Sequence, residues 1–167
     1  MYKQTLCFIR HNDHILMLNR NNVPLQGLWT GVGGKMNVDE SPLDCVIREI
    51  EEETTLVINK EVIQEKGVVT WEETNGAFKA DGMFVFVAKI AQCSIQTPLA
   101  TEEGLLDWKP ISWLLDPQNE GIDIIGRRFL PIVLFDQKPY HHQAIFTDDT
   151  FIAFETHPFR PSMPSSS

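Results

Sequence analysis

The sequence has few cysteines, little positive charge and no long apolar run among its 167 residues. The three cysteines, Cys7, Cys45 and Cys93, are widely spaced and form neither a zinc motif nor a disulfide framework, so a reducing cytoplasm is the simplest compartment. The apolar run over residues 6–9 closes at Arg10, which does not fit a signal peptide. No apolar run approaches the ~20 residues that span a bilayer, which excludes a membrane-spanning helix.

Positive charge is scarce because 14 lysines and arginines stand against 23 aspartates and glutamates, which gives a net charge of −9. Proteins that bind nucleic acid irrespective of sequence neutralise phosphates with Lys and Arg. We therefore expect no polymeric nucleic acid and no membrane among the partners. A small polyanionic molecule would have to be held locally, by a metal ion and a few basic groups. A monomer and a homodimer both remain open.

The apolar content suffices for one globular domain. Hydrophobic residues make up 43% of the chain, and a chain of this length fits one core. We assign residues 1–156 to a single domain. Residues 157–167 contain three prolines and four serines and are expected to form a flexible tail.

The clearest local signal predicts a helix over residues 42–54. Ser41 can cap it, Pro42 suits the first helical position, and Asp44 lies in the positively polarised first turn. At about 100° per residue, one arc of this helix carries the apolar residues that should face the core. They are Leu43, Val46, Ile47 and Ile50.

Three glutamates, Glu49, Glu52 and Glu53, share a neighbouring arc of this helix. Like charges at such spacings repel by a few tenths of a kcal/mol per pair on an exposed helix, so a cation is expected between them. Carboxylate oxygens on a rigid element are hard ligands, which select Mg²⁺ or Mn²⁺. A solvated acidic face is the alternative, and it is the commoner explanation of an isolated Glu-Glu-Glu run.

A glycine-rich segment precedes the helix and can form the other wall of such a site. Residues 29–35 are expected to begin as a short strand and to end in a glycine turn. The missing side chains of Gly33 and Gly34 let a phosphate or metal approach the backbone there. Cys45 lies one turn before Glu49, and its small side chain would let this segment fold down close to the acids.

The remaining elements predict an α+β fold. Apolar segments bounded by turn residues predict strands over residues 5–9, 15–18, 56–58, 67–71, 82–88, 105–108, 140–146 and 150–154. Residues 124–135 predict a helix in which Pro131 should cause a kink or start a second turn. The polar loop over residues 20–28 is a candidate lid, and the five histidines are expected at the surface. Without regular βαβ units, this order favours helices on the faces of a mixed sheet.

The spacing around the acidic helix resembles the Nudix box. Gly34, then Glu40, then the run Arg48-Glu49-Ile50-Glu51-Glu52-Glu53 stand at the spacing of that motif, and seven of its eight specified positions are met. The exception is Thr55, where the family has Gly. A Gly there ends the helix in the left-handed conformation, which Thr adopts only with strain of roughly 1–2 kcal/mol.

The resemblance covers most of residues 3–155. The lead-in over residues 29–35, the segment 102–108 and the segment 129–131 are similar to the MutT-type branch, which cleaves 8-oxo-dGTP. The resemblance implies an α/β/α sandwich around a curved mixed sheet, with the box as a loop-helix-loop against one end.

The resemblance also implies a metal site. Glu49, Glu52 and Glu53 would hold Mg²⁺, with Mn²⁺ as the other candidate, assisted by the Gly33 carbonyl and one distal acid. We prefer Glu103 over Glu102 as that acid. Either a helix glutamate or the distal acid would activate water.

Other residues would position the ligands and the substrate. Arg48 is expected to orient a glutamate, and Glu40 either to bridge the loop to Arg48 or to support a second metal ion. Lys35 and Arg20 would meet the phosphates, beside the wall formed by Trp29, Thr30 and Gly34. Trp29, Met83 and Phe84 could stack on a purine, although such residues in strands are more often core, and Asp123 could read a base edge.

The resemblance implies Mg²⁺-dependent cleavage of a nucleoside triphosphate, such as 8-oxo-dGTP, to nucleoside monophosphate and pyrophosphate. A Nudix hydrolase for a nucleotide sugar or a dinucleoside polyphosphate is the first alternative. A non-catalytic nucleotide-sensing module is the second; the complete set of helix glutamates argues against it, and Thr55 leaves it open. Removal of pyrophosphate from RNA 5′ ends is disfavoured by the net charge.

Overall fold

The structure, a computed structural model, describes residues 2–77 and 79–160. In chain order its elements are β1 (Gln4–His11), β2 (His14–Arg20), β3 (Trp29–Thr30), α1 (Pro42–Thr54), the 3-10 helix η1 (Lys60–Val62), β4 (Ile63–Glu73), β5 (Asp81–Lys89), β6 (Leu99–Ala100), β7 (Gly104–Pro110), α2 (Ile111–Leu114), α3 (Ile124–Phe135), β8 (Tyr140–Thr147) and β9 (Thr150–Pro158).

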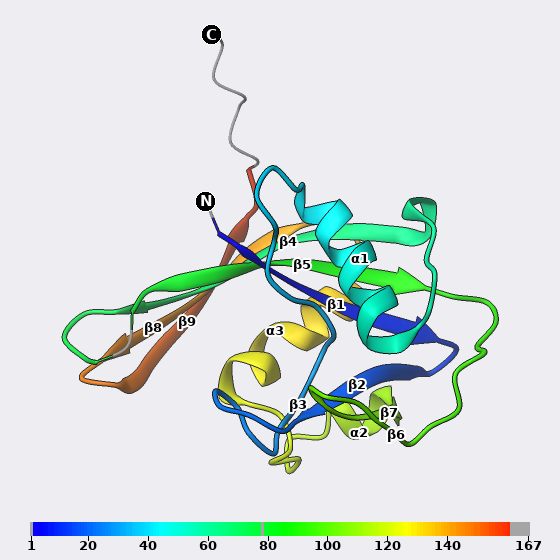
Figure 1. Ribbon diagram of the computed structural model, residues 1–167. Coiled ribbons are helices and arrows are strands. Elements are labelled where there is room, and N and C mark those ends of the chain that lie inside the picture. The colour runs from blue at the N-terminus through cyan, green and yellow to red at the C-terminus, as the bar shows by residue number, and fades with distance from the viewer. Residues whose placement is uncertain (1, 78, 161–167) are drawn as a thin grey trace, which may run out of the picture.

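All strands belong to one mixed sheet. Its order is β6-β7-β2-β1-β5-β4-β8-β9, and β3 pairs with β2. The ladders β1–β5 and β4–β8 are parallel, and the other ladders are antiparallel. In Figure 1, α1 covers one face of the sheet, α3 lies on the other, and β4, β5, β8 and β9 extend together as an arm. The expected α/β/α sandwich is confirmed.

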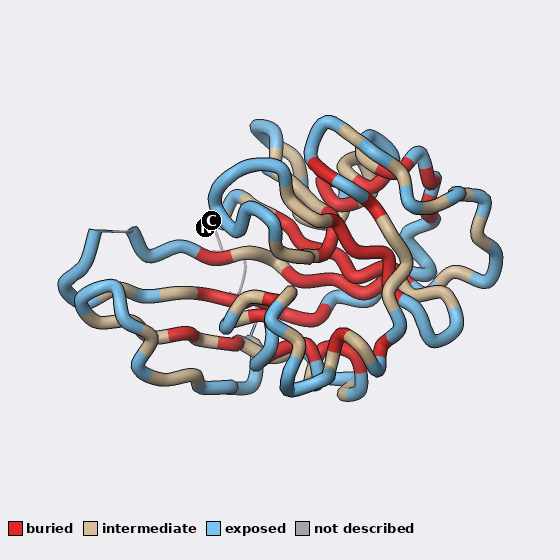
Figure 2. The backbone as a smooth tube through the Cα atoms, turned by 90° about the horizontal axis from the view of Figure 1, so that it is seen from below, coloured by how far each residue is buried: buried red, intermediate tan, exposed pale blue. Residues whose placement is uncertain are grey.

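Two apolar clusters fill the layers on either side of the sheet. In β1, Leu6 and Phe8 point into the cluster beneath α2 and α3, whereas Cys7 and Ile9 point into the cluster beneath α1. This is the alternation that a strand buried on both faces must show. Figure 2 shows buried backbone in the middle of the strands and exposed backbone at the tips of the arm.

Helix α1 begins and ends where its sequence predicts. The Ser41 hydroxyl accepts a hydrogen bond from the Asp44 N–H at 3.1 Å. The apolar arc faces the sheet, because Val46 and Ile50 are buried and the other two members, Leu43 and Ile47, pack against the same cluster. At the far end, Thr55 is left-handed (φ 66°, ψ 0°), and its N–H donates to the Glu51 carbonyl at 2.9 Å. The family's cap geometry is therefore kept, with a β-branched residue in it.

Helix α3 also has its predicted bounds and runs through Pro131 without ending. The side chain of Asp123 accepts hydrogen bonds from the backbone N–H groups of Ile125 and Gly126 and caps the helix. The short elements β6, α2 and η1 were not predicted, because two to four residues carry no readable periodicity.

Three expectations about the chain are wrong. Residues 56–58 form no strand; they alternate in burial because Leu56 and Ile58 pack under α1 while Val57 faces solvent. His142 is fully buried, stacked on Phe154 with 6.0 Å between ring centroids. The expected tail begins inside a strand, since β9 runs to Pro158; residues 161–167 of that tail lie outside the described residues.

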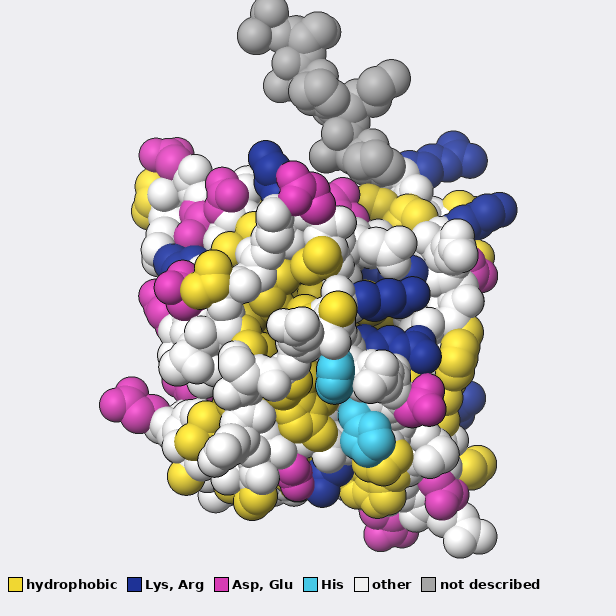
Figure 3. All heavy atoms as spheres, turned by 90° about the vertical axis from the view of Figure 1, so that its right-hand side faces the viewer, with side chains coloured by type: hydrophobic (Ala, Val, Ile, Leu, Met, Phe, Trp, Pro, Cys, Tyr) yellow, Lys and Arg dark blue, Asp and Glu magenta, His cyan; other side chains and the backbone are white. Residues whose placement is uncertain are grey.

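Charged side chains are unevenly distributed on one side of the molecule. On the side of the molecule seen in Figure 3, lysine and arginine side chains gather beside two histidines, and acidic side chains lie toward the rim. Among the described residues, every helix is too short or too polar to cross a bilayer.

Candidate active site

The candidate site lies between α1 and a glycine segment, which consists of Gly33, Gly34 and Lys35. The start of β1 holds this segment like a further strand. The Thr5 N–H donates to the Gly34 carbonyl at 2.9 Å, and an antiparallel bridge joins Gln4 to Lys35. The loop before α1, the first part of the predicted loop-helix-loop, is thus hydrogen-bonded to the sheet.

Every residue of the glycine segment touches the acidic machinery of α1. A Cβ on Gly34 would lie 2.3 Å from the Glu49 carboxyl carbon, so a larger residue there would displace that carboxylate. The Gly33 backbone lies close enough to the Glu53 carboxyl to lower its pKa, against the larger effect of burial. The Lys35 carbonyl accepts a hydrogen bond from Nη2 of Arg48 at 3.0 Å.

Arg48 is the hub of this arrangement. Its Nε and Nη2 donate to the two carboxylate oxygens of Glu40 at 2.8 and 2.9 Å. Its Nη1 donates to Glu49 at 2.9 Å and to Glu52 at 3.2 Å. The Arg48 guanidinium holds the pKa of the Glu40 carboxyl at about 2. Of the two roles expected for Glu40, the structure shows the bridge between the loop and Arg48.

Glu53 has a different environment. Its Oε2 is buried and has no hydrogen-bond partner among residues 2–77 and 79–160. Burial, followed by the negative charges of Glu49 and Glu103, raises the pKa of the Glu53 carboxyl to about 8. Burial also raises the pKa of Glu49. The site therefore collects negative charge where water is scarce, which is costly without a counter-ion.

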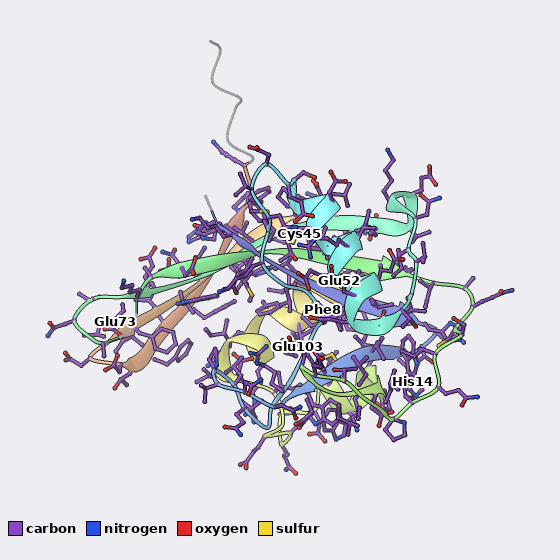
Figure 4. The ribbon with its side chains drawn as sticks, viewed as in Figure 1. Phe8, His14, Cys45, Glu52, Glu73 and Glu103 are labelled. Atoms are coloured by element: carbon purple, nitrogen blue, oxygen red, sulfur yellow. The ribbon has the colours of Figure 1, made fainter. Side chains whose placement is uncertain are left out.

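The candidate distal acid, Glu103, lies outside α1 and its negative charge acts on Glu53. Glu103 directly precedes β7, and its carbonyl accepts a hydrogen bond from the Asn21 N–H at 3.0 Å. Figure 4 places Glu103 and Glu52 in the same region of the molecule, with Glu73 far off on the arm. Arg20, which pairs with Gly104, contributes a positive charge that acts on Glu53.

The acids are not arranged as a finished coordination sphere. Among residues 2–77 and 79–160, no three His, Cys, Asp or Glu side chains converge at metal-ligand distances. Arg48 draws Glu49 and Glu52 toward its own guanidinium. A cation would therefore have to compete with Arg48 for these two carboxylates.

The predicted base-stacking residues lie on different faces of the sheet. Trp29 belongs to the α3 side, where Trp113 meets it edge-on at 6.3 Å and the Lys109 ammonium lies 4.3 Å from its ring centroid. Phe84 belongs to the α1 side. The structure therefore does not bring Phe84 to Trp29, and it is Met83 that shares the face of Trp29.

The other predicted substrate residues are placed as follows. Thr30 is half-buried and pairs with Leu18. The Arg20 Nε donates to the Pro24 carbonyl at 2.8 Å and so ties down the loop over residues 20–28. Asp123 lies half-buried as the cap of α3, with a pKa raised by burial.

Sequence reasoning missed three residues near the site: Thr5, Lys109 and Trp113. Thr5 is 1% exposed and is the one polar residue in the apolar run of β1, which was a readable signal. Lys109 gave none, because its contact with Trp29 depends on the pairing of β2 with both β3 and β7. Trp113 gave none either, because it lies in α2, which was not predicted.

Comparisons with known proteins identify the family of this chain. The NUDIX domain family model matches residues 2–129. Over 120 residues the chain is 32% identical to the Nudix hydrolase YvcI of Bacillus subtilis (strain 168). The matched residues make up 71% of this chain and 70% of YvcI.

Solved structures share the fold. The MutT protein of Bacillus halodurans superimposes with a TM-score of 0.75 at 23% identity, over 93% of this chain and 97% of that one. A bifunctional NMN adenylyltransferase/ADP ribose pyrophosphatase from Francisella tularensis, solved with AMP and a Mn ion, gives a TM-score of 0.59 at 19% identity, over 80% of this chain and 41% of that one. The chain belongs to the NUDIX domain family and is a Nudix hydrolase.

Proposed function

We propose that this Nudix hydrolase is a Mg²⁺-dependent diphosphatase that cleaves a nucleoside triphosphate, such as 8-oxo-dGTP or a related oxidised purine nucleotide, to nucleoside monophosphate and pyrophosphate. The observation that carries the proposal is the charged set on α1, in which Glu53 keeps a buried oxygen without a partner in the part of the chain that the structure describes. The MutT protein of Bacillus halodurans shares the fold on which this site is built.

The residues present fit a divalent cation. A carboxylate whose pKa is raised to about 8 by burial and by neighbouring acids gains most from a positive charge beside it. Oxygen donors of this kind suit Mg²⁺ and Mn²⁺. The proposed ligands are Glu49, Glu52, Glu53, Glu103 and the carbonyl of Gly33. When bound, the ion neutralises charge that develops on the phosphates and acidifies water.

The chain's own groups would do the rest. Arg48 orients Glu49 and Glu52 and ties them to the glycine segment through the Lys35 carbonyl. The Lys35 ammonium and Arg20 would bind phosphate oxygens. A site glutamate would take the proton of the attacking water.

The nucleoside would lie on the α3 side of the sheet. Trp29 and Met83 share that face. Thr30 follows Trp29 in β3 and would contact the substrate there, whereas Gly34, packed against Glu49, would let a phosphate approach the backbone. Asp123 is kept as the proposed reader of a base edge, because its contacts to Ile125 and Gly126 both use Oδ2 and leave the other oxygen for a ligand. Phe84 would act from the opposite face, as support for α1.

A substrate panel tests the proposal. The protein is incubated with 8-oxo-dGTP, dGTP, ATP, a nucleotide sugar and a dinucleoside polyphosphate, with Mg²⁺ or with EDTA, and pyrophosphate and phosphate are measured separately. Pyrophosphate released from the oxidised purine nucleotide, with Mg²⁺ only, is expected. Faster turnover of a nucleotide sugar or a dinucleoside polyphosphate would move the enzyme to another Nudix substrate class. Nucleotide binding without any turnover would favour a sensing module.

A further inference from the structure

Thr5 is a buried polar residue in a strand whose neighbouring residues are apolar. It lies in β1 next to Leu6, Cys7 and Phe8, is 1% exposed, and faces the layer beneath α1. A hydroxyl buried there costs stability unless hydrogen bonds satisfy it. A valine of the same shape would fill the space without that cost.

The Thr5 hydroxyl has two polar neighbours, Gly34 and Cys45. It donates to the Gly34 carbonyl at 3.3 Å and accepts from the Gly34 N–H at 3.4 Å. The Cys45 thiol of α1 lies 3.4 Å from the same oxygen and 3.7 Å from the Gly34 carbonyl. One side chain of the sheet therefore grips the glycine segment and α1 together.

The glycine segment touches β1 on one side and α1 on the other. A Cβ on Gly33 would lie 2.1 Å from the Thr5 carbonyl oxygen, and a Cβ on Gly34 would lie 2.3 Å from the Glu49 carboxyl carbon. The segment is thus packed directly between β1 and the acids of α1. A small shift of its backbone would move Gly33 against Glu53 and the Lys35 carbonyl against Arg48.

We propose that Thr5 is a positioning residue of the active site, which fixes the height of the glycine segment over the carboxylates and so sets the affinity for the divalent cation. The inference rests on the proposed metal site. Groups that hold a ligand-bearing segment from behind, without touching the metal, typically change affinity 10- to 100-fold when removed.

The test is Mn²⁺ binding by isothermal titration calorimetry, without nucleotide, on the whole chain. Thr5→Val is expected to weaken Mn²⁺ binding about 10-fold or more, whereas Thr5→Ser, which keeps the hydroxyl, stays within about 2-fold of the wild type. Thr70→Val is the matched control, because Thr70 is 3% exposed and its hydroxyl bonds His141, outside the site.

Each outcome decides the question. Equal Mn²⁺ affinity in Thr5→Val and the wild type overturns the role of Thr5 and leaves the metal site standing. A wild type that binds no Mn²⁺ overturns the metal site, and the role of Thr5 with it. If Thr5→Val does not fold, Thr5→Ser and Thr5→Ala are compared, since only the first keeps the hydroxyl. Similar affinity in those two again overturns the inference.

Discussion

Arg48 meets Glu40 side-on, with two guanidinium nitrogens donating to the two oxygens of one carboxylate at 2.8 and 2.9 Å. This fork ties the loop that precedes α1 to the middle of the helix. The remaining guanidinium nitrogen is left for Glu49 and Glu52. A lysine carries the same charge at a single point and cannot hold both groups.

Arg48→Lys is therefore expected to lower turnover by about 10- to 100-fold and the free energy of unfolding by about 1–3 kcal/mol. Steady-state kinetics and urea melts measure the two effects. Arg10→Lys is the control, because Arg10 pairs with Asp13 only at 4.0 Å, and Asp13 is 93% exposed. If Arg48→Lys behaves like that control, the tie has no functional role.

Glu52→Gln and Glu53→Gln should each lower turnover by at least about 100-fold while the fold is kept, because each removes negative charge that holds the cation. Circular dichroism and initial rates at saturating Mg²⁺ check this. Glu51→Gln is the matched control, since Glu51 is exposed on the same helix. Near-normal rates in both site variants would contradict the metal assignment.

Glu53→Gln should also change how stability depends on pH in EDTA. The folded-state pKa of Glu53, about 8, lies above its ordinary value of 4.5. Folding therefore favours the protonated acid, and stability falls as pH rises from about 4.5 to 8. At pH 8 the variant should be more stable than the wild type by about 1–3 kcal/mol, a range reduced for the partial exposure of the group. Urea melts at pH 5 and pH 8 measure the change, and identical pH profiles would contradict it.

Thr55→Gly should raise the free energy of unfolding by roughly 1 kcal/mol, because the left-handed cap puts the Thr Cβ under strain that Gly lacks. Asn12→Gly is the control: Asn12 is also left-handed (φ 53°), but Asn tolerates that region. Turnover should stay unchanged. A less stable Thr55→Gly protein in a denaturant melt would mean that the loss of chain stiffness outweighs the relief of strain.

His142 should make the fold acid-sensitive. Burial, and then the charge of His141, lowers its pKa to about 4, below its ordinary value of 6.5. The unfolded chain binds this proton first, so stability is lost as pH falls from about 6.5 to 4. The loss should reach up to about 3 kcal/mol and largely vanish in His142→Phe. Melts at several pH values measure it, with the exposed His14→Gln as control. An equal slope in His142→Phe would assign the acid sensitivity elsewhere.

The accuracy of the sequence-based predictions follows the range of the signals they used. Helix α1 and its acids were predictable because the signals are local: the capping residues lie at its two ends, and the apolar arc and the carboxylates recur every three or four residues. The face on which Phe84 lies was not, because a run that is apolar on both sides does not say which layer each residue enters. His142 was misassigned for the same reason: its burial depends on Phe129 and Phe154, which come from other elements.

The candidate site divides along the same line. The shared arc of the carboxylates follows from the helical period, whereas the sequence left two roles open for Glu40 and the structure shows its bridge to Arg48. The grip of Thr5 on Gly34 joins residues 29 apart and depends on strand pairing that no local pattern encodes. The left-handed Thr55 shows a third case, in which the fold imposes a geometry that local preference opposes.

The central position of β1 has a consequence for how the chain folds. β1 pairs in parallel with β5, Gln4 opposite Met83, so the middle ladder joins segments about 80 residues apart. Closing so long a loop costs entropy before the ladder returns any stability. During synthesis, the β1–β2 hairpin therefore lacks its β5 neighbour until β5 has been synthesised. Folding should be slow for a protein of this size, and β5, rather than α1, should govern its rate.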